Sequence, residues 1–407
     1  MRVGCREDYT FKYNQKLGRH GWLRLTPAYS VKLVRALMHN VQDDTLLSIR
    51  LLDPFSGTAT TGLVAAEEGL SAHLFEINPF LVWLGNVKCA NYRMEDLKRA
   101  RVDVEEIIEE YKEFMYDDNW IPSIYNINRW WSSHTLRILA ALRRALVCRF
   151  GEPGLNIGGL FWIGFCRVVI ETSAAAFNHV SMSFHNKVTA YEIEYVDGLF
   201  RMIMEAILTS ALQPLRGTAQ VFEVDSRKVR GVDGVRYTYV ITSPPYPNRI
   251  SYIRELRPYM YWTRFLEDAR TAGEIDWKAI GGTWGIATSR LRKWRPHFQE
   301  IPEEVYVVSE SIRNVDNKSA ELMGTYVLRY FHDMHAHFAS LRDVLMPGAR
   351  LFYIVGNSTF YGIRVDTEKL LARSLESLGY REIKYEVVRK RNTKKELFEY
   401  CLTATWG

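Results

Sequence analysis

The sequence has few cysteines, and they show no regular spacing. Five cysteines are scattered along 407 residues, and no two of them form a C-x-x-C pair. This pattern excludes a disulfide framework and a zinc site built on paired cysteines. We therefore expect no metal site, and a protein of a reducing compartment such as the cytoplasm.

Long hydrophobic runs are missing as well. The most apolar stretch, 155–170, is interrupted by Arg167 and is too short to span a bilayer. The first 16 residues are polar and lack the apolar core of a signal peptide. We expect neither secretion nor a membrane partner. Hydrophobic residues make up 47% of the chain, which excludes an intrinsically disordered or low-complexity protein.

Net charge is small but locally concentrated. Lysine and arginine total 53 against 47 acidic residues, an excess of +6 that permits a polyanionic partner without requiring one. One stretch, 284–298, mixes tryptophans with Arg290, Arg292, Lys293 and Arg295. Basic residues interleaved with aromatics suit phosphates and stacked bases. The alternative is an ordinary solvated surface.

Strands and helices alternate at both ends of the chain, which predicts an α/β fold. Thr26 and Pro27 have the character of a helix start. The apolar run 46–52 ends in Asp53 and predicts a buried parallel strand. A second short strand, 72–75, ends at Glu76, and a helical pattern follows each strand. This order is half of a doubly wound sheet.

The alternation stops between residues 93 and 216, where only helical patterns occur. Strand patterns resume at 219–224 and 237–242, and the chain closes with two strands that could form an antiparallel hairpin. We therefore expect one α/β domain in two halves, 1–92 and 217–407, separated by a helical insertion at 93–216. A second, irregular insertion is expected at about 247–319.

A glycine-rich turn follows the first strand, in the run Asp53-Pro-Phe-Ser-Gly57-Thr-Ala-Thr-Thr-Gly62. It fits a loose dinucleotide fingerprint, with Glu76 at the right distance to hold a ribose. Asp53 would repel a pyrophosphate but attract a cation. S-adenosylmethionine carries an ammonium, a sulfonium and a ribose diol, so it fits this turn better. The alternative is a plain strand–turn–helix.

A rigid loop, Ser243-Pro244-Pro245-Tyr246, comes directly after the strand that ends at Thr242. Each proline fixes its φ angle, and Pro244 pushes Ser243 toward an extended conformation. The result is a stiff loop that offers a hydroxyl, carbonyl acceptors and an aromatic ring. This combination suits an exocyclic amine on a planar base. The alternative is a tight turn with a buried tyrosine.

These two motifs resemble those of the amino-methyltransferase family of DNA methyltransferases. D-P-F-S-G-T-A-T-T is similar to the family's cofactor loop, and T-S-P-P-Y is similar to its catalytic loop. In that family S-P-P-Y is typical of enzymes that methylate cytosine N4. The resemblance covers 25–92 and 220–403 and implies a Rossmann-like, S-adenosylmethionine-dependent sheet that is mostly parallel. Ala59 stands where the family usually has glycine.

The resemblance also assigns roles to individual residues. It implies that Ser243, Pro244, Pro245 and Tyr246 hold the target base. It places Glu76 on the cofactor ribose and Asp225 at the adenine amine. The full set implied for the cofactor is Thr26, Pro27, Asp53, Pro54, Phe55, Gly57, Thr58, Thr60, Glu76, Ile77, Asp225, Ser226 and Thr242.

The implied activity is methyl transfer to the N4 amine of a cytosine flipped out of a specific site in double-stranded DNA. Such a protein would be the modification half of a prokaryotic restriction–modification or defence system, near the nucleoid, with a possible separately encoded endonuclease. Three alternatives remain: an adenine-N6 DNA methyltransferase, an RNA guanine-N2 methyltransferase, and a non-catalytic nucleotide-binding module. Ser243 argues against the first two because related enzymes with those targets more often carry Asp or Asn there. The rigid loop argues against the third.

Two groups of residues are candidates for DNA contact. Asn248, Arg249, Tyr252 and Arg254 follow the catalytic loop and could hold the flipped nucleotide or its phosphate. Their alternative role is simple loop packing. The helical insertion together with the basic cluster Arg290, Arg292, Lys293 and Arg295 is expected to form a DNA-facing wall.

Overall fold

The computed structural model describes residues 11–23, 25, 29–42, 49–176, 183–248, 251–282, 286–297, 301–391 and 396–407. Thr26, Pro27 and Arg249, three of the predicted site residues, lie outside these ranges. No helix in the described ranges has the length and apolar character needed to cross a membrane.

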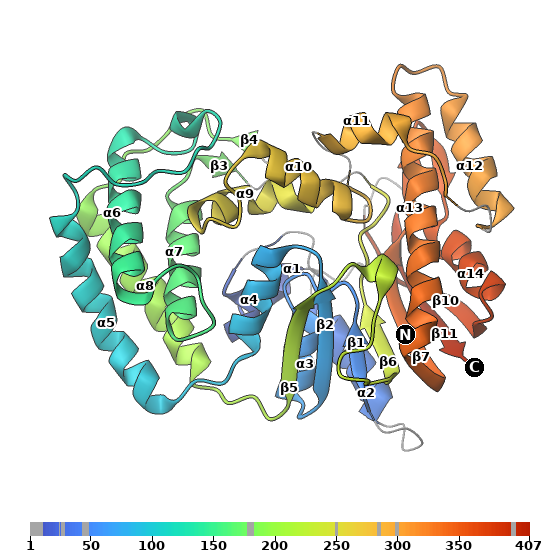
Figure 1. Cartoon of the computed structure of the whole chain (residues 1–407), viewed down its shortest axis with the longest axis horizontal. Helices are drawn as coiled ribbons and strands as arrows, with labels where there is room; N and C mark the ends of the chain where they lie inside the picture. The colour runs from blue at the N-terminus through green and yellow to red at the C-terminus, as the bar shows by residue number, and fades with distance from the viewer. Residues whose placement is uncertain are drawn as a thin grey trace.

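A seven-stranded sheet forms the centre of the molecule (Figure 1), in the order β10-β11-β7-β6-β1-β2-β5. Five strands are parallel, and β11 runs antiparallel to both of its neighbours. The predicted α/β sheet with a closing antiparallel hairpin is therefore confirmed. The strands are β1 (Leu51–Asp53), β2 (Ser71–Glu76), β5 (Thr218–Glu223), β6 (Tyr237–Thr242), β7 (Leu345–Gly356), β10 (Arg381–Lys390) and β11 (Phe398–Trp406).

Helices cover both faces of the sheet. On one face α2 (Val31–Gln42) and α3 (Thr60–Glu67) bury Leu51, Leu74 and Ile241. On the other face α13 (Ala320–Leu341) and α14 (Thr367–Ser377) pack on Leu52, Val240 and Tyr353. Alternate strand residues thus face opposite cores, as the two-residue period of a strand requires.

The expected helical insertion is a lobe of four helices beside the sheet (Figure 1). These are α5 (Met94–Glu113), α6 (Ser133–Phe150), α7 (Gly158–Glu171) and α8 (Ile193–Ala211). The lobe also holds a short antiparallel pair, β3 (Ala175–Ala176) with β4 (Ser183–Phe184), which the sequence patterns did not predict. Together with α4 (Pro79–Cys89), the four helices form one buried apolar core.

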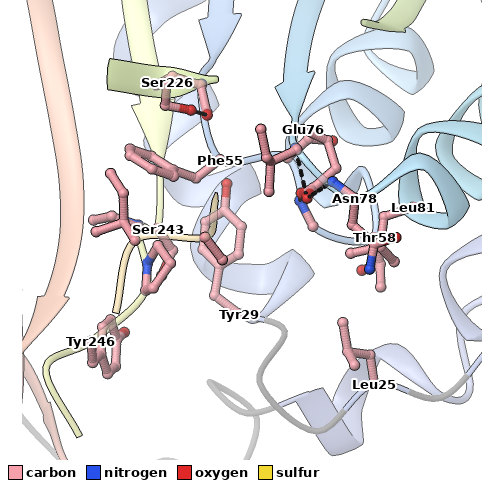
Figure 2. A pocket seen from close by; sticks show the side chains of 18 of the residues that line it. Leu25, Tyr29, Phe55, Thr58, Glu76, Asn78, Leu81, Ser226, Ser243 and Tyr246 are labelled. Atoms are coloured by element: carbon pink, nitrogen blue, oxygen red, sulfur yellow. Dashed lines mark hydrogen bonds between the residues drawn. The ribbon is translucent and has the colours of Figure 1, made fainter. Parts of the chain in front are cut away.

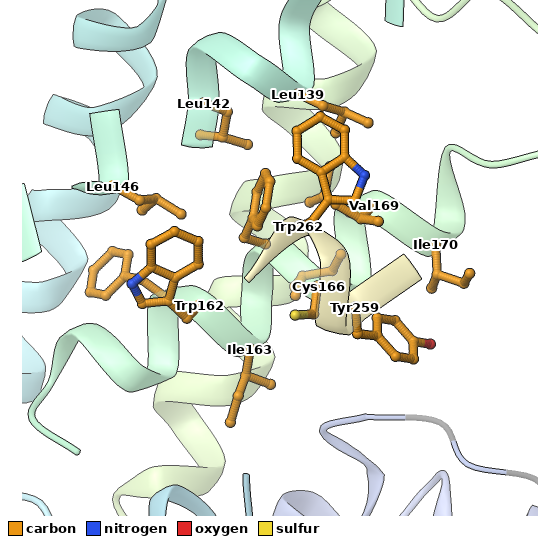
Figure 3. Close-up of a cluster of buried hydrophobic side chains, with 14 of the residues drawn as sticks. Leu139, Leu142, Leu146, Trp162, Ile163, Cys166, Val169, Ile170, Tyr259 and Trp262 are labelled. Atoms are coloured by element: carbon orange, nitrogen blue, oxygen red, sulfur yellow. The ribbon is translucent and has the colours of Figure 1, made fainter. Parts of the chain in front are cut away.

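The second insertion is helical, so the expectation of an irregular segment at 247–319 was wrong. It contains α9 (Tyr252–Trp262), α10 (Ala269–Lys278), α11 (Ile286–Lys293) and α12 (Glu303–Arg313). Pro258 inside α9 and the glycines after α10 obscured the helical period in the sequence. Trp262 of α9 packs edge-on against Phe165 of α7, with ring centroids 5.7 Å apart, within the buried cluster of Figure 3. The two insertions therefore share a core.

The first long helix begins later than its sequence suggested. A start at Thr26–Pro27 was expected, but Tyr29 and Ser30 are not helical and α2 begins at Val31. The Ser30 hydroxyl accepts a hydrogen bond from the Lys32 amide at 3.2 Å, and the Ser30 carbonyl accepts from Val34. Ser30 therefore provides the start signal that the sequence analysis assigned to Thr26.

Arg19 joins the two ends of the helical insertion. Its guanidinium donates to the carbonyls of Lys88 and Ala90, just before the insertion. It also donates to the carbonyls of Ala211 and Gln213, at the end of the insertion, both at 2.9 Å. Arg19 is buried, so these four bonds are shielded from water.

Replacing Arg19 tests this linkage. Arg19→Met should lower the free energy of unfolding by about 3 kcal/mol or more, because it removes several charge-assisted bonds and leaves buried carbonyls unpaired. Thermal denaturation of the variant measures the loss. The control is Arg201→Met, which removes an exposed pair with Glu105 and should cost about 1 kcal/mol or less. Equal effects of the two substitutions would contradict the role given to Arg19.

Candidate active site

A cavity of about 470 Å³ lies where β1, β2, β5 and β6 end. It sits at the point where the strand order reverses, since the chain passes from β1 outward to β2 and β5 and returns to β6 on the other side of β1. Open α/β sheets bind their ligands at such switch points. Figure 2 shows Glu76, Asn78 and Leu81 on one side of the cavity and Ser243 and Tyr246 on the other.

Asp53 closes the floor of the site at the end of β1. Its Oδ1 accepts from the Phe55 amide at 3.0 Å and from the Thr242 hydroxyl at 2.6 Å. Its Oδ2 is buried and has no hydrogen-bond partner among the described residues. Burial raises the pKa of Asp53 to about 6. An unpaired buried carboxylate oxygen of this kind fits a cationic ligand.

Glu76 at the end of β2 holds the glycine turn. Its two oxygens accept from the amides of Gly57, Ile77 and Asn78, each at 2.9 Å. Burial raises the pKa of Glu76 to about 7 despite these bonds. Three of about four lone-pair positions are thereby used within the protein, which leaves room for one further donor.

Ala59 adopts the left-handed conformation that its position in the turn requires. Its φ is +62°, and Gly57 has a φ of +52°. A left-handed non-glycine residue is unfavourable by about 1 kcal/mol or more, so the usual glycine would fit with less strain. Lys88 supports the turn from α4, because its buried ammonium donates to the Thr58 carbonyl at 2.6 Å.

Asp225 follows β5 and is bound by Arg227. Its Oδ1 accepts from the Arg227 amide and Nε, both at 3.0 Å, and its Oδ2 accepts from Nη2 at 2.7 Å. Burial alone would raise the pKa of Asp225, but the bonds from Arg227 lower it overall. The carboxylate is therefore ionised and fixed. Ser226 donates to the Pro54 carbonyl and ties this segment to the glycine turn.

The rigid loop after β6 is held by bonds to other elements. The Ser243 hydroxyl donates to the Ile354 carbonyl of β7 at 3.2 Å. The Pro245 carbonyl accepts from the Tyr330 hydroxyl of α13 at 2.8 Å. Because Ser243 donates its one hydroxyl proton to Ile354, its oxygen can act only as an acceptor toward a ligand.

Tyr246 is packed under a cation. The Arg391 guanidinium carbon lies 5.3 Å from the centroid of the Tyr246 ring. A Cβ atom at Gly356 would lie 2.8 Å from the ring, so only glycine fits there without displacing it. Burial raises the pKa of Tyr246, which keeps its hydroxyl neutral.

The structure brings most of the predicted cofactor and catalytic residues to this one cavity. Asp53 and Thr242 lie buried at its floor. The predicted residues that line it are Pro54, Phe55, Gly57, Thr58, Thr60, Glu76, Ile77, Asp225, Ser226, Ser243, Pro244, Pro245 and Tyr246. Their chemical roles remain predictions.

The predicted DNA-contacting residues divide into two groups. Asn248 lines the cavity, while Tyr252 and Arg254 lie at the start of α9. The basic cluster lies on α11 and just beyond it. Arg292, Lys293 and Arg295 are exposed, whereas Arg290 is bound to Glu274 through two bonds of 2.6 and 2.7 Å.

The sequence analysis missed several wall residues. Tyr29 lies between the catalytic loop and the Glu76 side of the cavity (Figure 2), and its hydroxyl bonds to Thr61. Its position two residues after the expected helix start was the one available signal. Others come from distant segments with no motif of their own: Leu25, Leu81, Ile253, Lys278, Ile280, Arg389, Arg391 and Glu399.

No family model matches the chain. It is similar to the Type II methyltransferase M.AvaI of Nostoc sp. (strain PCC 7120 / SAG 25.82 / UTEX 2576), with 22% identity covering 92% of this chain and 82% of the relative. M.BsoBI of Geobacillus stearothermophilus is 21% identical, covering 97% and 85%. M.MvaI of Kocuria varians is 20% identical, covering 85% and 78%. Both are also named Type II methyltransferases.

These similarities extend over both halves of the sheet and both insertions, because they cover most of the chain. The central sheet, with its parallel strands and the antiparallel β11, is the Rossmann-like sheet of a methyltransferase. The chain is thus similar, along most of its length, to proteins named Type II methyltransferases.

Proposed function

We propose that the protein is an S-adenosylmethionine-dependent DNA methyltransferase that modifies the N4 amine of cytosine. The observation that carries the proposal is a single cavity with two chemically different walls. One wall has the carboxylates Glu76 and Asp225, with Asp53 buried at the floor below, and the other is the loop Ser243–Tyr246. A methyl donor and a planar amine could meet between them.

The carboxylate wall suits the cofactor. Asp53 offers an unpaired buried oxygen to a cation, Glu76 has room for a ribose hydroxyl, and Asp225 is an ionised acceptor for an adenine amine. When bound, S-adenosylmethionine supplies an electrophilic methyl group on its sulfonium. The chain's own residues fix the position and charge of that group, and positioning is the main requirement of such a transfer.

The loop suits an exocyclic amine. Ser243 donates its proton to Ile354 and can only accept from the amine. The Pro245 carbonyl already accepts from Tyr330, so the Pro244 carbonyl is the second acceptor we assign. Two acceptors for the two amine hydrogens turn the nitrogen lone pair out of ring conjugation. Tyr246 lies beside them and can stack on the base.

Cytosine N4 is favoured over adenine N6 by the serine. A hydroxyl is shorter than a carboxylate or amide, and it leaves room beside a pyrimidine amine. The names of the relatives specify no target atom. Adenine N6 is the second candidate, because its chemistry would use the same two acceptors.

Double-stranded DNA is the proposed substrate, and the base must leave the stack to reach the cavity. The shared name of the relatives supports the modification half of a restriction–modification system, with a possible separate endonuclease. The exposed basic residues on and just beyond α11 suit a polyanion.

The methylated nucleoside identifies the target. The protein is incubated with labelled S-adenosylmethionine and mixed-sequence DNA, and the digested nucleosides are separated by mass spectrometry. We expect label in N4-methylcytosine. Label in the N6-methyladenine nucleoside alone would replace the first candidate with the second, and label in no nucleoside would exclude both.

Cofactor affinity should depend on pH through the two carboxyls. A cation and ribose hydroxyls favour ionised carboxylates, so affinity should rise from pH 5.5 to 8, as Asp53 and Glu76 lose protons around pH 6 and 7. Glu76→Gln should weaken cofactor binding at pH 8 by about 1.5–3 kcal/mol. It should leave only the change in affinity near pH 6, which comes from Asp53. Calorimetry across this range tests both effects, with exposed Glu113→Gln as control. An unaltered pH profile in Glu76→Gln would remove the assignment.

Tyr246 should act on the base and not on the cofactor. Tyr246→Ala should remove a stacking interaction of about 1–3 kcal/mol and most turnover. Tyr246→Phe retains the ring and should keep most of the activity. Both variants should bind S-adenosylhomocysteine like the parent protein. Full methylation by Tyr246→Ala would be incompatible with this role.

The exposed basic residues should contribute to DNA binding through phosphates. Replacing Arg292, Lys293 and Arg295 with alanine should weaken binding to all DNA sequences. The slope of log affinity against log salt concentration should become less steep by about 0.9 for each phosphate that is no longer neutralised. Affinity measured at several salt concentrations gives the slope. The control replaces three exposed basic residues elsewhere, Lys369, Arg373 and Arg381. If the two triple variants share one slope, α11 does not face DNA.

A further inference from the structure

A chain of four alternating charges runs from the cavity to α13. Asp225 is bound by Arg227, whose Nη1 lies 3.4 Å from Asp333 Oδ2. Asp333 in turn lies 3.5 Å from Nε of Arg329. The side chains of Asp333 and Arg329 are 7% and 5% exposed, so solvent screens these contacts little.

Both arginines of this chain also hold the end of α10. Nη2 of Arg227 donates to the Lys278 carbonyl at 2.9 Å, and Nη2 of Arg329 donates to the Trp277 carbonyl at 2.7 Å. The Arg329 guanidinium also lies over the Trp277 ring, 3.5 Å from its centroid. The last carbonyls of a helix lack partners within it and favour cations, so these contacts anchor α10 by its C-terminus.

Arg227 therefore contacts two parts of the molecule with different proposed roles, the cofactor pocket and helix α10. Through Asp225 it touches the wall where the proposal places the cofactor adenine. Through Lys278 it touches α10, which lies over the sheet between the helical lobe and α11 (Figure 1). Lys278 and Ile280 line the same cavity as Asp225.

We infer that Arg227 is a positioning residue that couples the cofactor pocket to α10, so that the adenosyl ligand and DNA each bind more tightly when the other is present. The inference rests on the proposed function. Arg227 already holds Asp225 and the end of α10 without a ligand, and a ligand amine that donates to Asp225 restricts this linkage further. α10 is joined in turn to the basic helix α11 by the Glu274–Arg290 pair at 2.6 Å, which connects the linkage to the proposed DNA-binding surface. Coupling of this kind is reciprocal by thermodynamic necessity.

The planar guanidinium is needed for this role. Arg227 reaches Asp225, Asp333 and Lys278 at once because its donors point in different directions. A lysine ammonium is a single point on a flexible stem and cannot keep three such partners together. Arg227→Lys thus keeps the charge and removes the linkage.

The test is a binding cycle with the full-length protein. DNA affinity is measured with and without S-adenosylhomocysteine, in the parent, in Arg227→Lys and in Asp333→Asn. In the parent, S-adenosylhomocysteine should raise the affinity for DNA about fivefold or more, within the usual range of coupling. In both variants the ratio of the DNA affinities with and without this ligand should fall toward one. Arg201→Lys, an exposed pair in the helical lobe, should keep the parent ratio.

Two further measurements do not depend on the variants folding. In the parent, S-adenosylhomocysteine should slow amide exchange in α10. S-inosylhomocysteine, which lacks the adenine amine, should bind more weakly and leave the DNA affinity unchanged. A parent ratio of one, unchanged exchange in α10, or an unchanged ratio in both variants would overturn the inference. Failure of the parent to bind S-adenosylhomocysteine at all would instead overturn the proposed function.

Discussion

The hydrogen bond from Thr242 to Asp53 joins the two halves of the site. It is 2.6 Å long and links the last residue of β6 to the last residue of β1. The glycine turn starts from one of these residues and the rigid loop from the other. Because β1 and β6 are adjacent and parallel, their ends reach the same edge of the sheet. A slip of one residue in this pairing would turn one of the two side chains to the opposite face and separate the two walls of the cavity.

The insertions add rigidity around this edge. Arg19 fastens the beginning and the end of the helical lobe together, and the buried aromatic core of the lobe extends to Trp262 of α9. α10 follows α9 and is fixed at its far end by Arg227 and Arg329. The elements above the cavity are thus attached both to the lobe and to α13. Positioning a base within a fraction of an ångström requires this kind of support.

The sequence predicted the parts of the site that lie close together along the chain. Asp53 to Gly62 and Thr242 to Tyr246 are continuous, and their chemistry follows from residue types and strand ends. The alternation of strands and helices predicted the sheet and its closing hairpin. The helices of the second insertion were missed because Pro258 interrupts the pattern of α9, although it fits within the helix.

The remaining wall could not be predicted because it depends on contacts between distant segments. Arg389 and Glu399 meet across β10 and β11, with bonds of 2.6 and 2.7 Å. In the sequence, Arg227 is only a basic residue two positions after Asp225. Its partners Lys278 and Asp333 come from the distant helices α10 and α13. Nothing in the local sequence specifies such partners, since a charged residue is most often solvated.

A crystal structure with S-adenosylhomocysteine tests the central claim most directly, because the claim concerns where one ligand lies between two walls. The account predicts the adenine amine at Asp225, a ribose hydroxyl at Glu76 and the amino-acid end near Asp53. The sulfur should then face Ser243 and Pro244 across the cavity. A ligand bound elsewhere, or one whose sulfur points away from the Ser243–Tyr246 loop, would contradict the account.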